Sequence, residues 1–203
     1  IGHGVVDLVK ATRTTVYRSR QQGMVYIAWL VKGRLHHPEH VAQLESRLLT
    51  RAHVDSQMAR YGTPPPILAP FKSYWFAGFA EGDGCFLMRR TEVILEVSQV
   101  GPVLLDMIQS HFGRGSRRVK VRKQGFASGS SIGVWHSSNL EVTLACITYF
   151  DRFPCMGQKH TEYLFWRLAV KLRESGCHLW PVGKRMFSGL KSILSCIRKK
   201  GLM

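Results

Sequence analysis

One stretch, residues 74–86, constrains the fold more than any other because it couples a helix to a strand. Its sequence is YWFAGFAEGDGCF. The aromatic residues recur at helical spacing, which predicts a helix over residues 73–81. Gly82 and Gly84 are predicted to end that helix. Asp83, between the two glycines, then lies where the helix stops and a strand begins.

One side of this predicted helix carries almost no side chains. Ala77, Gly78 and Gly82 lie on it. A glycine inside a helix costs about 1 kcal/mol relative to alanine, so two of them four residues apart indicate that another backbone approaches closely. We therefore predict a helix–helix interface there, and we include Glu81 in it.

The carboxylate of Asp83 is unfavourably placed for stability. The C-terminal end of a helix carries partial negative charge and favours cations. A bound metal ion would resolve this conflict. The alternative is that Glu81 and Asp83 are solvated turn residues.

The segment FAGFAEGDG resembles the defining motif of the LAGLIDADG homing endonucleases, with Phe76 at the position of the first Leu and Gly84 at that of the last Gly. The resemblance covers residues 71–203. It implies an α+β fold in which a curved antiparallel sheet packs on helices. It also implies that two such helices pack through their small faces, and that the last acidic residue of each holds divalent metal ions at the scissile phosphates. That role would fall on Asp83.

Two weaker matches follow in the order that the family has them. Residues 91–100 alternate as in a strand with one buried face, and Gln99 at the end matches a family Gln that positions water or ligands; the alternative is a satisfied structural residue. The segment FPCMGQKHTEYLFWRLAVKL matches the family stretch that places a lysine before a long helix, which makes Lys159 the active-site lysine. An ammonium group near a phosphate stabilises developing negative charge. Its alternative role is to cap the helix through Thr161 or Glu162.

The charge of the chain predicts a nucleic-acid partner. Its 203 residues include 29 Lys and Arg against 13 Asp and Glu, a net charge of +16, which suits a polyanion. Residues 114–123 carry six basic residues and no acid. Arg118, Lys120 and Arg122 share one face of a predicted strand, so we expect these unpaired charges to contact phosphates or bases while the two valines between them pack on helices. The predicted nucleic-acid-binding residues, which include Glu96 as an acceptor for cytosine, are Arg89, Arg90, Glu96, Arg114, Arg117, Arg118, Lys120, Arg122 and Lys123.

Residues 1–70 are predicted to be a basic, partly helical extension of the domain at 71–203. No acidic residue lies between Asp7 and Glu39. This bias is compatible with an arm on nucleic acid, with the remains of an organelle-targeting segment, or with a solvated tail. The proline run after Thr63 predicts a stiff linker, and we place the boundary there.

Two functions remain open at this point. With one copy of the motif, the resemblance implies a homodimer that cuts both strands of a pseudo-palindromic DNA with divalent ions, expected to be Mg²⁺. The alternative is a non-catalytic, RNA-binding use of the fold, as an intron maturase or as an organellar ribosomal protein among ribosomal RNA and proteins. No apolar run reaches the roughly 20 residues that span a bilayer, so we expect no membrane partner. We expect an organelle, a mitochondrion rather than a chloroplast.

Overall fold

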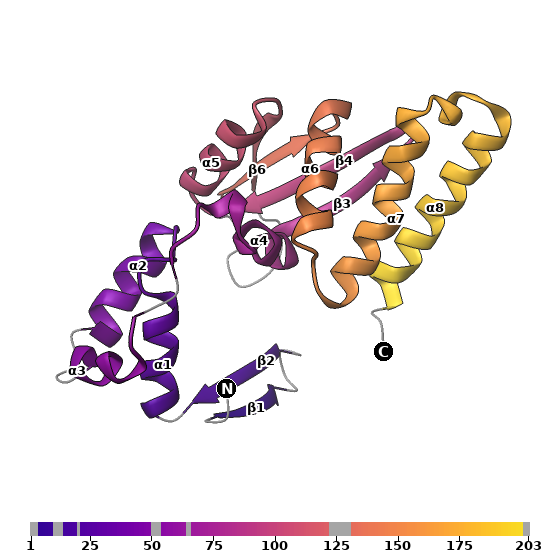
Figure 1. Ribbon diagram of the computed structural model, residues 1–203. Helices are drawn as coiled ribbons and strands as arrows, with labels where there is room; N and C mark the ends of the chain where they lie inside the picture. Colours follow the sequence, from indigo (N-terminus) through magenta and orange to yellow (C-terminus); the bar gives the residue numbers. More distant parts are fainter. Residues whose placement is uncertain are drawn as a thin grey trace. The chain divides into compact units, whose positions relative to one another are not determined.

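The computed structural model divides the chain into two compact units, Ile1–Leu68 and Ala69–Met203 (Figure 1). The residues that the structure describes are 4–9, 14–19, 21–49, 54–63, 66–121 and 131–200.

The first unit combines a strand pair with short helices. Strands β1 (Gly4–Val9) and β2 (Thr14–Ser19) are antiparallel. The pair was not predicted. The helical elements are α1 (Gln21–Val31), α2 (Pro38–Leu44), a π-helical turn (Glu45–Leu49), α3 (Val54–Met58) and a 3-10 turn (Ala59–Tyr61). Among the residues of this unit whose side chains the structure describes, the buried core consists of Val25, Ala28, Val54 and Met58.

The second unit is an antiparallel sheet packed on helices. Its sheet has the strand order β3-β4-β6-β5, and every neighbouring pair is antiparallel. This arrangement confirms the predicted α+β fold. The elements are α4 (Trp75–Asp83), β3 (Gly84–Arg89), β4 (Glu92–Gln99), α5 (Val103–Phe112), β5 (Ser116–Val121), β6 (Ser131–Ser137), α6 (Leu140–Arg152), α7 (Gly157–Glu174) and α8 (Pro181–Lys200).

The core of this unit lies between one face of the sheet and the helices that cross it. Figure 1 shows α6 and α7 across the sheet and α8 beside α7. Phe86 of β3 is fully buried, with ring centroids 5.3 Å from Phe150 of α6 and 5.2 Å from Trp166 of α7. The indole N–H of Trp166 donates to the carbonyl of Ile94 at 3.0 Å. Burying side chains of this size contributes about 1.5–3 kcal/mol each, so the aromatic contacts fix the helices on the sheet.

The end of α4 differs from the prediction and explains why a glycine follows the motif. The helix includes Gly82 and ends with Asp83, two residues later than predicted. The Gly84 N–H still donates to the Ala80 carbonyl. A Cβ at Gly84 would lie 2.6 Å from that oxygen. The chain passes from helix to strand without a loop, and because this brings Gly84 against Ala80, no side chain fits at position 84.

Two expectations about the strands are wrong. In β4, Ile94 and Glu96 are only 4% and 7% exposed, so neither face of this strand is simply polar. In β5, Val119 and Val121 are 71% and 63% exposed instead of packed on helices. The physical reason is position, because β5 is the edge strand opposite β3, and the buried core draws on β3, β4 and β6 but on no residue of β5. None of the helices that the structure describes has both the length and the hydropathy to cross a membrane.

Candidate functional site

The last residue of α4 lies at one end of the sheet. Asp83 is exposed and is followed directly by Gly84, the first residue of β3. The register pairs Gly84 with Val97 of β4, so Gln99 lies at the same end of the sheet, two residues farther along. Gln99 is half-buried and pairs with Gly133 of β6. The β3–β4 pairing therefore brings the first two predicted site residues to one place.

Lys159 reaches this place from α7. It lies within the first turn of that helix instead of before it, and its side chain is 17% exposed. Its Nζ donates to the Gly84 carbonyl at 2.9 Å, on the residue that follows Asp83. The Nζ also lies 4.0 Å from the Glu162 carboxylate. Lys159 thus lies against the residue that follows Asp83, and it also makes the Glu162 contact of its alternative capping role.

A second cation behind Lys159 was missed by sequence reasoning. Glu162 is 4% exposed and accepts a hydrogen bond from Nε of Arg198 at 2.9 Å. Arg198 also donates to the carbonyl of Phe86 in β3. A buried carboxylate needs such compensation, and this pairing ties α7, α8 and β3 together behind the lysine. The spacing of Lys159 and Glu162 could be found in the sequence, but nothing there points to Arg198.

The predicted interface face of α4 is open at two positions. Gly78 and Gly82 are exposed, and no described heavy atom lies within 4 Å of the place where a Cβ would stand on either. Glu81 accepts a hydrogen bond from the backbone N–H of Met156, at the start of α7, where negative charge is favourable. Ala77 lies in the core, at 2% exposure, and not on the open face. The face available to a partner is therefore formed around the two glycines.

The basic side chains of β5 were expected to be unpaired, but Arg118 and Lys120 are paired with Glu96. Glu96, in the middle of β4, accepts from Nζ of Lys120 at 2.6 Å and from Nη2 of Arg118 at 2.5 Å. Burial by itself would raise the pKa of Glu96, but the hydrogen bonds and charges of Lys120 and Arg118 outweigh it and hold the pKa below its usual value. The oxygens of Glu96 are thus engaged within the chain. Arg118 and Lys120 are held in place on the sheet, with 37% and 45% of their side chains exposed.

His136 is a further member of this face that sequence reasoning missed. The register places it opposite Glu96, between β4 and β5. Burial, and then the charge of Arg118, lower the pKa of His136. Its Nδ1 is buried and has no hydrogen-bond partner among the described residues. A neutral imidazole therefore lies beside the ion pairs, and strand alternation through residues 132–137 was the signal for it.

Two other predicted contacts are surface ion pairs. Arg117 of β5 pairs with Asp106 of α5, and Arg114 pairs with Glu141 of α6 at 3.1 Å. Exposed pairs of this kind contribute about 0–1 kcal/mol. A phosphate can therefore replace the carboxylate at little loss of stability.

Two further predicted residues lie where β3 turns into β4. Arg89 and Arg90 are exposed at the β3–β4 turn, where Arg90 has a positive φ of 50°. Arg122 and Lys123 lie outside the described residues, so their assignment stays a prediction.

Comparison with known proteins bears on the fold. No protein-family model matches the sequence, and no curated protein matches it. Solved structures do match: the meganuclease I-AabMI bound to uncleaved DNA has 19% identity over 63% of this chain, with a TM-score of 0.52. The archaeal intron-encoded homing endonuclease I-Vdi141I complexed with DNA has 21% identity over 64% of this chain, with a TM-score of 0.51. The chain has the LAGLIDADG homing-endonuclease fold.

This likeness confirms the resemblance that the motif suggested, at the level of the LAGLIDADG fold. The chain spans 44% of I-AabMI and 48% of the meganuclease I-CpaMI, but 86% of I-Vdi141I. The matched part of this chain therefore corresponds to about half of each of the first two proteins.

Proposed function

We propose that this chain is a site-specific DNA endonuclease that binds DNA on its sheet and cuts both strands as a homodimer. The observation that carries the proposal is the placement of Asp83. It ends a helix with an open glycine face, at the same end of the sheet as Gln99 and next to the residue that Lys159 contacts. Two such helices packed face to face would bring two carboxylates together on a two-fold axis.

The donors at this place suit a hard divalent cation. The Asp83 carboxylate and the Gln99 amide offer oxygen ligands of the kind that Mg²⁺ prefers. The described residues contain no group of three or more His, Cys, Asp and Glu side chains that could hold a metal ion. In this proposal the second subunit's Asp83 completes the site.

The protein and the ion would divide the chemistry. A bound divalent ion activates water and stabilises charge on the phosphate. Asp83 and Gln99 would hold the ion, while Lys159, fixed by the Gly84 carbonyl, would place an ammonium beside the phosphate and stabilise developing negative charge. No covalent intermediate with the protein is needed.

The test combines a measurement of the protein's mass in solution with a DNA cleavage assay. Light scattering of the purified protein with random-sequence duplex DNA should give about twice 23.0 kDa for the protein component. A library of randomised duplexes should then yield a cut, pseudo-palindromic sequence with Mg²⁺ and none with EDTA. A protein that stays monomeric and cuts no library member would contradict the proposal.

A second candidate, RNA binding without catalysis, is favoured by the first unit. Tyr26, Trp29 and Tyr61 form a ring cluster there, with centroids 5.1–5.7 Å apart, and Tyr61 is 38% exposed. Exposed aromatic rings stack on unpaired bases. This role would suit an intron maturase or a mitochondrial ribosomal protein. Tight binding of structured RNA without DNA cleavage would support an RNA function. If that binding survives Tyr61→Ala, the aromatic cluster is not the contact with RNA.

A further inference from the structure

One side of α8 is a basic surface that the proposed site does not use. The helix carries six basic residues and no Asp or Glu. Phe187, Leu190 and Leu194 are buried against the core. A hollow of about 540 Å³ runs along the exposed side, and the residues that line it are Ser188, Lys191, Ser192, Ser195, Cys196 and Lys199.

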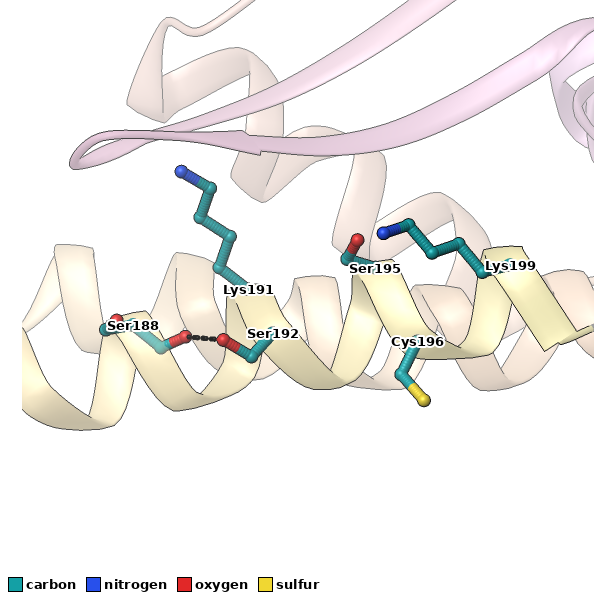
Figure 2. Close-up of a pocket in the computed structure, with 6 residues that line it drawn as sticks. All are labelled: Ser188, Lys191, Ser192, Ser195, Cys196 and Lys199. Carbon is teal, nitrogen blue, oxygen red and sulfur yellow. Dashed lines mark hydrogen bonds between the residues drawn. The ribbon is translucent and has the colours of Figure 1, made fainter.

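The chemistry of this hollow matches a phosphodiester backbone. Figure 2 shows that Lys191 and Lys199 project from the same side of the helix, with Ser195 between them. The serine side chains are short, so a sugar–phosphate chain can approach the helix closely, and their hydroxyls can donate to phosphate oxygens. The Ser192 hydroxyl donates to the Ser188 carbonyl at 3.1 Å.

The spacing of the two lysines fits a strand of duplex DNA. They are eight residues apart, which corresponds to about 12 Å along an α-helix. A DNA strand carries one phosphate per about 3.4 Å of helix axis. Two flexible lysine side chains at this separation can therefore neutralise phosphates a few nucleotides apart on one strand.

The helix is tied to the same end of the sheet as the candidate site. Arg198 bonds the Phe86 carbonyl of β3, and the Gln158 amide donates to the carbonyl of Ile197 at 3.1 Å. Gln158 precedes Lys159 in the first turn of α7. The basic side of α8 thus starts near the candidate site and leads away from it along the helix.

We propose that this side of α8 binds the phosphate backbone of duplex DNA flanking the segment bound on the sheet. The inference rests on the proposed DNA-binding function and extends its footprint beyond the sheet. It assigns Lys191 and Lys199 to sequence-independent contacts, which add affinity without reading bases.

The test measures salt-dependent binding of a random-sequence DNA duplex. The variant Lys191→Ser/Lys199→Ser removes two charges from the hollow, and Arg152→Ser/Lys171→Ser removes two exposed charges from α6 and α7 as the matched control. All four positions are exposed, so both variants should remain folded at the temperature of the binding assay, which thermal unfolding checks. The slope of log K against log salt should become shallower by about 0.9 for each lysine that contacts a phosphate, and the control should keep the parent's slope.

Each other outcome overturns the inference in its own way. If the parent binds duplex DNA and the α8 variant keeps its slope, the α8 surface is wrong and the proposed function stands. If the parent does not bind duplex DNA, both fail. If the α8 variant changes the slope only for an RNA duplex of the same length, the ligand is RNA and the assignment to DNA is wrong.

Discussion

Lys159 is held by a backbone acceptor, the Gly84 carbonyl, and by the nearby Glu162 carboxylate. Asp83, by contrast, is exposed at the end of its helix. At the scale of single residues, the two contacts that hold Lys159 are therefore independent of the Asp83 carboxylate.

This independence predicts the behaviour of Asp83→Asn. The amide has nearly the same shape but no charge with which to hold a cation, so divalent-dependent cleavage should fall below detection while DNA binding stays within a few-fold. An exposed change of this kind alters the free energy of unfolding by less than about 0.5 kcal/mol. Thermal unfolding and a binding titration check both points. If the variant fails to fold, Asp83 is structural.

Glu96 makes a different prediction, because it is buried between two cations. Glu96→Gln keeps the shape and leaves Arg118 and Lys120 without their anion, and both are part-exposed, so we expect a loss of about 1–2 kcal/mol. The control is Glu141→Gln, which breaks the exposed pair with Arg114 and should change stability by less than about 1 kcal/mol.

The same residue sets a dependence on pH. The folded-state pKa of Glu96 is lowered, so its contribution to stability is present above the unfolded pKa of about 4.3 and is lost as the pH falls through the folded value. The stability difference between the parent and Glu96→Gln should therefore be constant near neutrality and shrink below about pH 4. Chemical denaturation at pH 7 and pH 3 measures it. A difference that grows in acid would contradict the pairing.

At the next scale, two glycines at the end of α4, Gly82 and Gly84, serve different purposes. Gly82 has open space around it, whereas a side chain on Gly84 would meet the Ala80 carbonyl. We expect Gly82→Ala to stabilise the single chain by up to about 1 kcal/mol, because alanine favours the helix, and to weaken the homodimer. Gly84→Ala should destabilise the single chain itself. Light scattering and thermal unfolding separate the two effects. A Gly82→Ala protein that dimerises as tightly as its parent would place the interface elsewhere.

Elements with strong local signals were predicted well. The helix α5, for example, ends at Phe112, and the residue after it is Gly113, whose φ of 71° suits glycine, so a local signal marks this helix end. The pairing of Glu96 with Lys120 could not be predicted, because β6 lies between their strands and the strand order is not written in either segment. Val119 and Val121 were misassigned for the same reason, since alternation shows which side chains share a face but not whether anything covers it.

Of the candidate site, Asp83, Gln99 and Lys159 were found through a family motif, and the register then placed them together. Arg198 is distant from these residues in sequence, so its contribution depends on packing that no local pattern encodes, whereas strand alternation was a usable signal for His136. In the first unit, the basic bias of the sequence says nothing about strand pairing, so the β1–β2 pair was not predicted.

At the scale of the whole molecule, the division at Leu68 predicts that the second unit folds alone. A protein comprising residues 69–203 contains the complete sheet and the larger core. It should unfold in a single cooperative transition, because one contiguous core supports it. Calorimetry and circular dichroism check this. A truncated protein without fixed tertiary structure would show that the first unit is needed for folding.

The anchoring of Lys159 by a main-chain carbonyl also bears on how such a protein can change over generations. Substitution at position 83 leaves that acceptor intact, because the acceptor is the main-chain carbonyl of the next residue. Every residue type at position 84 would present this carbonyl, although only glycine fits the space there. Cutting can thus be lost in one step while the architecture that carries the sheet persists. Selection can then act on what the surface binds, and a lineage that starts from a DNA-cutting ancestor has a short route to descendants that only bind.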